Sequence, residues 1–423
     1  MLPNTDLTAD DRKGLRALEW LNFFVADVQT GLGPFLAAYL AVRGWNPERV
    51  GLMLTLGGVI TVAVQTPAGA IVDHSRGKRR VMALGLAALA AGALLLFAST
   101  RTLSVCAAEA LIGGAGPFLG PTLAAITLGM VGAQRFTRQF GRNQAFNSAG
   151  NVATALAVGV ASRLFGVRAI FLVAAVLVAP TGVVLAAIPA AQIDYARARG
   201  ASERKNAGSG AQARVSAASA AFADRVLLGF IACACLFHLA NAAMLPELGE
   251  LLSQHQARSA AGFMSACVIV TQVVITFTAA PIAKLASRIG RRPLLLVGFG
   301  VLPVRGVLYT LAHGVTSLVA IQMLDGVANA IFGVVSILVI ADRTRGTGRF
   351  NLMQGALATV VGIGAALSTT VGGLLIEHAS YRVSFLGLAG IAACATAMLW
   401  VAVPETLPGR GANESAGTEI QDA

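Results

Sequence analysis

The chain has 423 residues, of which 56% are hydrophobic and 12% are charged, and its mean hydropathy is +0.72. Soluble domains carry about twice that share of charged residues, so the composition excludes a soluble protein and predicts one that lies in a membrane. The net charge of +12 would suit nucleic acid as a partner. The placement of the basic residues along the chain decides whether such a partner is needed.

Stretches of about 20 apolar residues predict membrane-spanning helices. Twelve of them follow one another, at residues 18–42, 50–72, 80–100, 103–130, 144–166, 168–189, 226–252, 262–285, 293–312, 316–341, 350–377 and 381–403. They lack the alternation of period two that marks a membrane β-barrel. The predicted fold class is therefore an all-α membrane protein with twelve transmembrane helices.

A polar segment rich in Ala, Gly and Ser separates six predicted helices from six. The sequence thus predicts an N-terminal six-helix bundle at 1–189, a cytoplasmic linker at 190–225, a C-terminal six-helix bundle at 226–404 and a tail at 405–423. We expect no cleavable signal, because the first apolar run is too long for the apolar core of a signal peptide.

The Lys and Arg residues gather in every second loop. With a cytoplasmic N-terminus, 24 of the 32 lie on the cytoplasmic side, 7 lie outside and 1, Arg305, lies within a span. This asymmetry follows the positive-inside rule. We therefore expect both termini to be cytoplasmic, the location to be the inner or plasma membrane, and no nucleic-acid partner.

Corresponding loops of the two halves resemble each other. GAIVDHSRGKRR at 69–80 matches PIAKLASRIGRR at 281–292, and GRNQAFN at 141–147 is echoed more weakly by GRFNLMQ at 348–354. Internal repeats of this size in a helical membrane protein are typical of transporters built from two related bundles.

The twelve spans, their 6+6 division and the loop GAIVDHSRGKRR resemble the major facilitator superfamily, whose signature there is Gly-x-x-x-Asp-(Arg)-x-Gly-(Arg/Lys)-(Arg/Lys). The resemblance implies two pseudo-symmetric six-helix bundles that work by alternating access. It also implies a gating motif, here Gly69, Asp73, Gly77, Lys78, Arg79 and Arg80, with Gly290, Arg291 and Arg292 as the counterpart in the second half. Gly69 would allow close helix packing, Asp73 would be the gating carboxylate, and Gly77 would form the turn.

The chain departs from this signature in two ways. Three residues separate Asp73 from Gly77 where the family usually has two, and Ser287 stands near the place of the second carboxylate, so we expect the second gate to lack its charge. Asp73 itself ends a helix beside cations and can face the positive N-terminus of a helix in the other half. The alternative is an ordinary solvated loop.

Polar side chains within the spans are the candidates for binding substrate and protons. The resemblance implies that spans 1, 4, 7 and 10 line a cavity, and nearly all the acidic residues in spans fall on these four. The candidates are Asn22, Asp27, Gln29, Glu109, His238, Asn241, Arg305, Gln322, Asp325 and Asn329. Glu109, like Glu247 in span 7, is near the outer end of its span and can instead be interfacial, and His238 can instead be a packing residue.

Asp325 and Arg305 are the most costly charges in the spans. An Asp at a helix centre costs about 2.5–3.5 kcal/mol on insertion scales, and Asp325 shares a helical face with Gln322 and Asn329. Arg305 lies on the preceding predicted helix, and an ion pair with Asp325 is the simplest solution for both charges. Because a paired carboxylate holds a proton poorly, the pairing makes Asp27 the rival site for proton coupling.

The sequence therefore predicts a secondary transporter and no enzyme, because it shows no metal-ligand cluster, nucleophile–base pair, nucleotide loop or ATPase domain. We expect a proton gradient as the energy source, no cofactor, a small-molecule substrate, the lipid bilayer as the surroundings and a monomeric chain. The excess of buried acids favours efflux of a drug-like, cationic or neutral organic compound.

Two alternatives stay open. The fifth span lacks the Gly-Pro found in many drug-exporting relatives, which leaves proton-coupled uptake of a neutral metabolite as the second hypothesis. A receptor or scaffold that has kept the fold and lost transport is the hypothesis of another class. The surviving charges at Asp73 and in the spans favour transport over that role.

Overall fold

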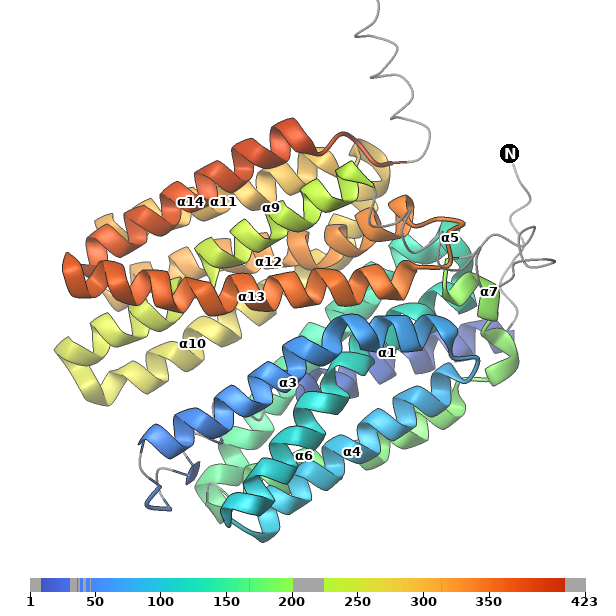
Figure 1. Cartoon of the computed structure of the whole chain (residues 1–423), viewed down its shortest axis with the longest axis horizontal. Coiled ribbons are helices and arrows are strands. Elements are labelled where there is room, and N and C mark those ends of the chain that lie inside the picture. The colour runs from blue at the N-terminus through green and yellow to red at the C-terminus, as the bar shows by residue number, and fades with distance from the viewer. Residues whose placement is uncertain are drawn as a thin grey trace, which may run out of the picture. The chain divides into compact units, whose positions relative to one another are not determined.

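The computed structural model describes residues 9–30, 36, 39, 40, 43–45, 47–166, 168–200, 224–312 and 314–407, without the side chains of residues 9, 27–30, 47, 48, 51, 159, 162, 163, 250 and 252–265. All the regular elements in this part of the chain are helices. They form two compact units (Figure 1). Unit 1 is Met1–Arg204 with Gly348–Gly355, and unit 2 is Lys205–Thr347 with Ala356–Ala423.

The described residues of unit 1 include five long helices and two short ones, besides the first turns of α13 (Phe350–His378). They are α1 (Ala9–Thr30), α3 (Pro47–His74), α4 (Lys78–Ala98), α5 (Thr102–Phe165), α6 (Ala169–Ala187), the 3-10 turn η1 (Ala190–Gln192) and α7 (Tyr195–Ala198). Large apolar side chains from α1, α4, α5 and α6 form its core, among them Leu18, Leu89, Leu119 and Leu185. In Figure 1, α4 and α6 run side by side.

The helix α5 holds two of the predicted spans, 103–130 and 144–166. Its 64 residues are interrupted at Gly132, whose φ of 68° and ψ of 172° lie outside the helical region. Glycine adopts a positive φ at no steric cost, so it can join two helices that continue on either side. The predicted loop between the spans is therefore helical beyond Gly132, and Arg142 lies on a helix.

Unit 2 contains α9 (Arg225–Asn241), α10 (Met244–Ile289), α11 (Arg292–Leu311), α12 (Val315–Arg343), most of α13 (Phe350–His378) and α14 (Tyr381–Ala402). The helices α9, α11 and α14 lie side by side (Figure 1). Apolar side chains such as Met244, Leu248, Leu318 and Leu388 pack into one of its core clusters.

The predicted span 226–252 is broken between α9 and α10. Pro246 has no backbone N–H to donate to the carbonyl of Ala242, and its ring crowds that carbonyl, so a continuous helix is disfavoured there. The N–H of Ala243 donates instead to Oγ of the buried Ser368, at 2.9 Å. The predicted span is therefore made of α9 and the start of α10 in succession, and Ala242 and Ala243 between them keep helical φ and ψ.

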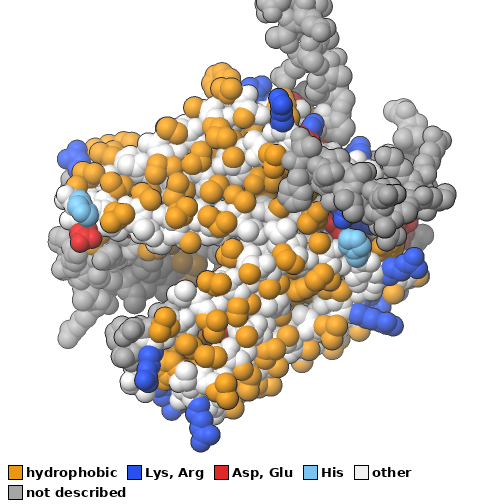
Figure 2. Space-filling view, in the orientation of Figure 1, with side chains coloured by type: hydrophobic (Ala, Val, Ile, Leu, Met, Phe, Trp, Pro, Cys, Tyr) orange, Lys and Arg blue, Asp and Glu red, His pale blue; other side chains and the backbone are white. Residues whose placement is uncertain are grey.

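Ten helical segments of the described residues are long and apolar enough to cross a membrane. One of them, Thr102–Val158 with 57 residues, contains the predicted span 103–130 and most of the span 144–166, and the predicted span 18–42 begins in α1 and lies partly outside the described residues. Hydrophobic side chains cover the sides of the helices, and basic side chains lie mainly at the helix ends (Figure 2). The chain is an all-helical membrane protein that accommodates the twelve predicted spans.

The first turns of α13 belong to unit 1 because two glycines let them approach α3 closely. A Cβ atom at Gly69 would meet the backbone oxygen of Asn351, and one at Gly355 would meet the backbone oxygen of Gln65. Gly69 therefore allows the close packing that the motif predicts. The predicted linker is described only up to residue 200 and from residue 224, and the predicted tail only up to residue 407.

We predict that Gly69→Ala lowers the stability of the protein, because backbone atoms of Asn351 cannot give way to the added methyl group as a side chain could. Overpacking of this kind costs about 1–3 kcal/mol. The matched control is Gly58→Ala in the same helix, where an added Cβ meets nothing within 4 Å. Thermal unfolding of the detergent-solubilised variants measures the effect, and equal melting temperatures for the two would contradict the close packing.

Candidate functional site

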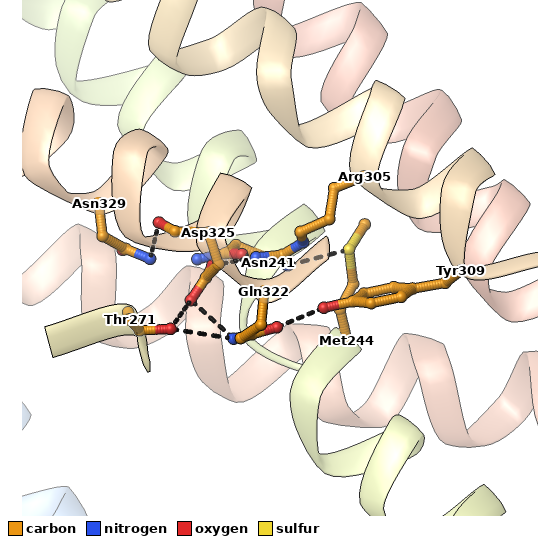
Figure 3. Close-up of polar contacts among 8 residues, drawn as sticks. All are labelled: Asn241, Met244, Thr271, Arg305, Tyr309, Gln322, Asp325 and Asn329. Atoms are coloured by element: carbon orange, nitrogen blue, oxygen red, sulfur yellow. Dashed lines mark hydrogen bonds and ion pairs between the residues drawn. The ribbon is translucent and has the colours of Figure 1, made fainter. Parts of the chain in front are cut away.

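A buried polar cluster in unit 2 joins α9, α10, α11 and α12 (Figure 3). At its centre Nη1 of Arg305, a residue that is 1% exposed, donates to Oδ1 of Asp325, which is 8% exposed. This ion pair confirms the contact predicted from the sequence. Two opposite charges that lie in apolar surroundings stabilise each other, whereas either one alone would be costly to bury.

The second carboxylate oxygen of Asp325 is also occupied. Oδ2 accepts from Oγ1 of Thr271 at 3.3 Å and from Nε2 of Gln322 at 3.0 Å. The amide oxygen of Gln322, a residue with no exposed surface, accepts from the hydroxyl of Tyr309. The cluster therefore holds the orientation of the carboxylate with neutral donors as well as with the arginine (Figure 3).

Arg305 also reaches the break in the seventh span. Its Nη2 donates to Oδ1 of Asn241 at 2.6 Å and lies 3.1 Å from Sδ of Met244, the residues on either side of the break. Its Nε is buried and has no hydrogen-bond partner in the described part of the chain. One arginine thus links a charged residue of α12 to the ends of α9 and α10.

Two predicted members make no hydrogen bond to another side chain of this cluster in the described structure. Asn329 donates to the backbone oxygen of Asp325 in its own helix, at 3.0 Å. His238 packs its ring against Phe332, with the ring centroids 4.8 Å apart, and its Nε2 lacks a hydrogen-bond partner among the described residues. Sequence reasoning missed Thr271, Met244 and Tyr309, although Tyr309 follows Arg305 by one helical turn, the spacing that could have indicated it.

In unit 1 the candidate residues whose side chains are described, Asn22 and Glu109, do not form a comparable cluster. Glu109 is 8% exposed and makes no hydrogen bond to a described residue, and its carboxylate fills the space left by the missing side chain of Gly57. Asn22 donates to the backbone oxygen of Leu18 in its own helix. The side chains of Asp27 and Gln29 lie outside the described residues.

Unit 1 contains a polar network of its own, which the sequence did not predict. Glu19 on α1 pairs with Nε of Arg142 at 2.9 Å and accepts from Nε2 of Gln139 at 3.1 Å. Gln139 also donates to Asn143, which in turn donates to Thr127. Both Arg142 and Asn143 belong to the repeated segment GRNQAFN, so the weaker of the two sequence echoes marked this network.

Asp73, the predicted gating carboxylate, is 2% exposed and faces the first turn of α13. It accepts from the backbone N–H of Leu352 at 2.8 Å and from the N–H and Nδ2 of Asn351 at 3.2 and 2.8 Å. A carboxylate at a helix N-terminus satisfies free N–H groups and interacts favourably with the helix dipole. This geometry confirms the predicted helix contact and excludes a solvated loop.

The basic residues of the motif differ in their exposure to solvent. Lys78 is buried and its Nζ donates to the backbone oxygen of Val72, whereas Arg80 is exposed. The turn at Gly77 has a φ of −94°, which any residue can adopt. In the second loop Gly290 has a φ of 109°, so glycine is required there for conformational reasons.

The arginines of the second loop have acidic partners that the sequence did not predict. Nε of Arg291 pairs with Asp342 at 2.9 Å, and Glu405 accepts from the N–H groups of Arg291 and Arg292 at 2.8 and 3.2 Å. Ser287 hydrogen-bonds only to its own helix in the described structure. The second motif thus lacks a carboxylate of its own, as expected, and the acidic partners of its arginines come from distant parts of the chain, which the local motif does not include.

Comparison with known sequences identifies the family of this chain. The model of the Major Facilitator Superfamily matches residues 20–275 and 232–421, which together span nearly the whole chain. The chain belongs to this superfamily. As a member it is a membrane transporter, and nothing in the described residues points to a catalytic centre.

Relatives agree with this assignment. Two proteins of Mycobacterium tuberculosis, from the strains CDC 1551 / Oshkosh and H37Rv, are named uncharacterized MFS-type transporters and are 41% identical over 395 residues, 93% of this chain and 93% of theirs. The human vesicular acetylcholine transporter is 32% identical over 128 residues, which is 30% of this transporter and 24% of the human protein.

We predict that Arg305→Gln destabilises the transporter and that adding Asp325→Asn restores part of the loss. The single change leaves a buried carboxylate without its cation, which costs about 3–5 kcal/mol in comparable pairs, whereas the double change leaves neutral groups that can hydrogen-bond. A double-mutant cycle on thermal unfolding in detergent measures the coupling between the two residues. Purely additive losses would contradict a stabilising ion pair.

Proposed function

We propose that this protein is a secondary active transporter that exports a small organic compound, drug-like and cationic or neutral, in exchange for protons. The observation that carries the proposal is the position of the Arg305–Asp325 pair beside the break in the seventh span. Substrate sites of secondary transporters are typically built where a membrane helix is interrupted, because the freed backbone and side-chain groups can bind a ligand. A receptor or scaffold would have no need of such costly buried charges.

The balance of charge supports a cationic or neutral substrate. Asp325 is neutralised by Arg305, whereas the buried Glu109 makes no salt bridge to a described residue. The surplus is negative, which attracts cations and repels anions. The human relative is named for acetylcholine, an organic cation, and its similarity to part of this chain points in the same direction.

Glu109 is our candidate for the proton carrier. An ionised carboxylate is costly to bury without a partner, so the side chain has reason to exchange a proton during the transport cycle. Asp325 serves a different role in this scheme, because its two oxygens are held by Arg305, Gln322 and Thr271. Asp27 remains the second candidate for the proton, on the sequence alone.

The orientation that we propose has both termini and the loop 69–80 in the cytoplasm of a cell whose inner or plasma membrane holds the protein, because most of the basic residues then face inward. Asp73 then holds the start of α13 at the cytoplasmic end of unit 1. A contact that forms in one conformation and breaks in the other biases the equilibrium between them.

We predict that Glu109→Gln weakens coupling to the proton gradient. The neutral amide has nearly the shape of the carboxyl group but exchanges no proton, so gradient-driven transport should fall by about 5- to 150-fold, the range of typical coupling energies. Substrate exchange without a gradient should persist. Both are measured in proteoliposomes with acetylcholine and a panel of organic cations and neutral drugs, with and without a pH gradient.

The control is Glu377→Gln, a neutralisation of an exposed glutamate that should leave both rates unchanged. Full gradient-driven transport by Glu109→Gln would reject Glu109 as the carrier. Accumulation that runs with the protons would favour uptake over efflux. Failure of the wild-type protein to transport any compound of the panel, with or without a gradient, would favour the receptor or scaffold.

We predict that Asp73→Asn loosens the first turn of α13. The substitution replaces charge-assisted hydrogen bonds with weaker neutral ones and places an N–H donor against other donors. The contact should lose about 1–3 kcal/mol of stabilising free energy. Amide hydrogen exchange around Asn351 and Leu352 should then accelerate by about 5- to 150-fold. His74→Gln, an exposed neighbouring change, should have no such effect, and equal exchange rates in the two variants would contradict the contact.

A further inference from the structure

Unit 1 contains a cavity of about 800 Å³ that neither the polar cluster nor the helix contact of Asp73 explains. It lies between α4 and α6, next to the basic loop. Its walls include Arg76, Arg79 and Arg80 at one end and small apolar residues such as Ala83, Ala87 and Gly182 along the rest. The cavity therefore has a basic end and an apolar body.

The arginines at the basic end are available to an anion. Arg76, Arg79 and Arg80 have no carboxylate within 4 Å in the described structure. Nη2 of Arg79 donates to the backbone oxygen of Ala186 at 3.2 Å, which holds the side chain across the gap between the two helices, while its buried Nε has no partner. Arg80 is exposed. Their charges are balanced by no group that the structure describes.

The apolar body is a groove formed by small residues. Ala83 and Ala87 on α4 face Gly182 and Ala186 on α6, and all four are exposed. An added Cβ at Gly182 would meet nothing within 4 Å. Large apolar side chains beside the groove, such as Leu84 and Val183, each 71% exposed, belong to the surface that a membrane protein turns toward lipid.

We propose that this cavity binds an anionic phospholipid, with the phosphate on Arg79 and Arg80 and one acyl chain along the groove between α4 and α6. Arginine forms charge-assisted, bidentate hydrogen bonds with phosphate. Basic pockets between membrane helices are suited to anionic headgroups. The apolar body favours a lipid over a free phosphate compound, because a soluble ligand would leave that groove without a complementary group.

The test measures binding of phosphatidylglycerol and of phosphatidylcholine to the purified full chain in detergent, by native mass spectrometry and by thermal stabilisation. We expect phosphatidylglycerol to bind more tightly. Arg79→Gln with Arg80→Gln should weaken its binding by about 25-fold, since each arginine near an anionic surface contributes about a fivefold factor. Gly182→Leu, which places a side chain in the groove, should also weaken phosphatidylglycerol binding.

Matched controls separate this site from general surface charge. Arg225→Gln, an exposed arginine at the start of α9, and Gly300→Leu, where an added Cβ also meets nothing within 4 Å, should retain full binding. If the double arginine variant is unstable, Arg80→Gln alone tests the headgroup contact. Equal binding of the two lipids, loss of binding in the controls but not in Gly182→Leu, or equally tight binding of soluble glycerol 3-phosphate would each overturn the proposal.

Discussion

A charge that lies among membrane helices must find its partner within the protein, because the hydrocarbon of the bilayer supplies no water. Arg305 and Asp325 meet this constraint together, and their neighbours complete it: Thr271 and Gln322 donate to the carboxylate, and Asn241 accepts from the guanidinium. Four helices of unit 2 are thereby tied to one another by directed bonds, where apolar packing alone would allow them to slide. The ion pair also lowers the free-energy cost of burying the two charges. The polar groups that could serve transport therefore also hold the four helices in place.

Breaks and glycines shape the backbone around these polar groups. Pro246 interrupts the seventh span, and Ser368 supplies the acceptor that the freed N–H of Ala243 needs. In unit 1, Gly69 and Gly355 remove the side chains that would separate α3 from the first turn of α13, so Asp73 can reach the helix N-terminus. Backbone groups freed at helix ends and breaks are costly in a membrane unless a side chain satisfies them. The polar residues of this chain therefore stabilise the backbone at helix ends and breaks, which are also the positions where a transporter needs to bend.

The two repeated loops use charge differently. In the first, one carboxylate from within the motif, Asp73, binds the start of a helix, and Lys78 is buried beside it. In the second, Arg291 is held by Asp342 and by Glu405, neither of which belongs to the loop. A repeat thus keeps its outline, a glycine followed by basic residues, while the acidic partner changes its place in the chain. Arg79 and Arg80, which have no acidic partner among the described residues, are the part of the first loop left open to an external anion.

The sequence by itself determined the class of protein and most of the spans, and it offered the Arg305–Asp325 pair as the simplest solution for two costly charges. Apolar length and charge distribution are local or additive properties, and a lone Arg and a deep Asp on successive helices left few other solutions. Only the tertiary structure decided which neutral groups join that pair, that Asn329 bonds to its own helix, that His238 packs against Phe332, and that Glu19 and Glu405 are partners of arginines. These contacts join residues far apart in sequence, and the rotation of each helix about its axis sets them, which depends on how all the neighbouring side chains pack.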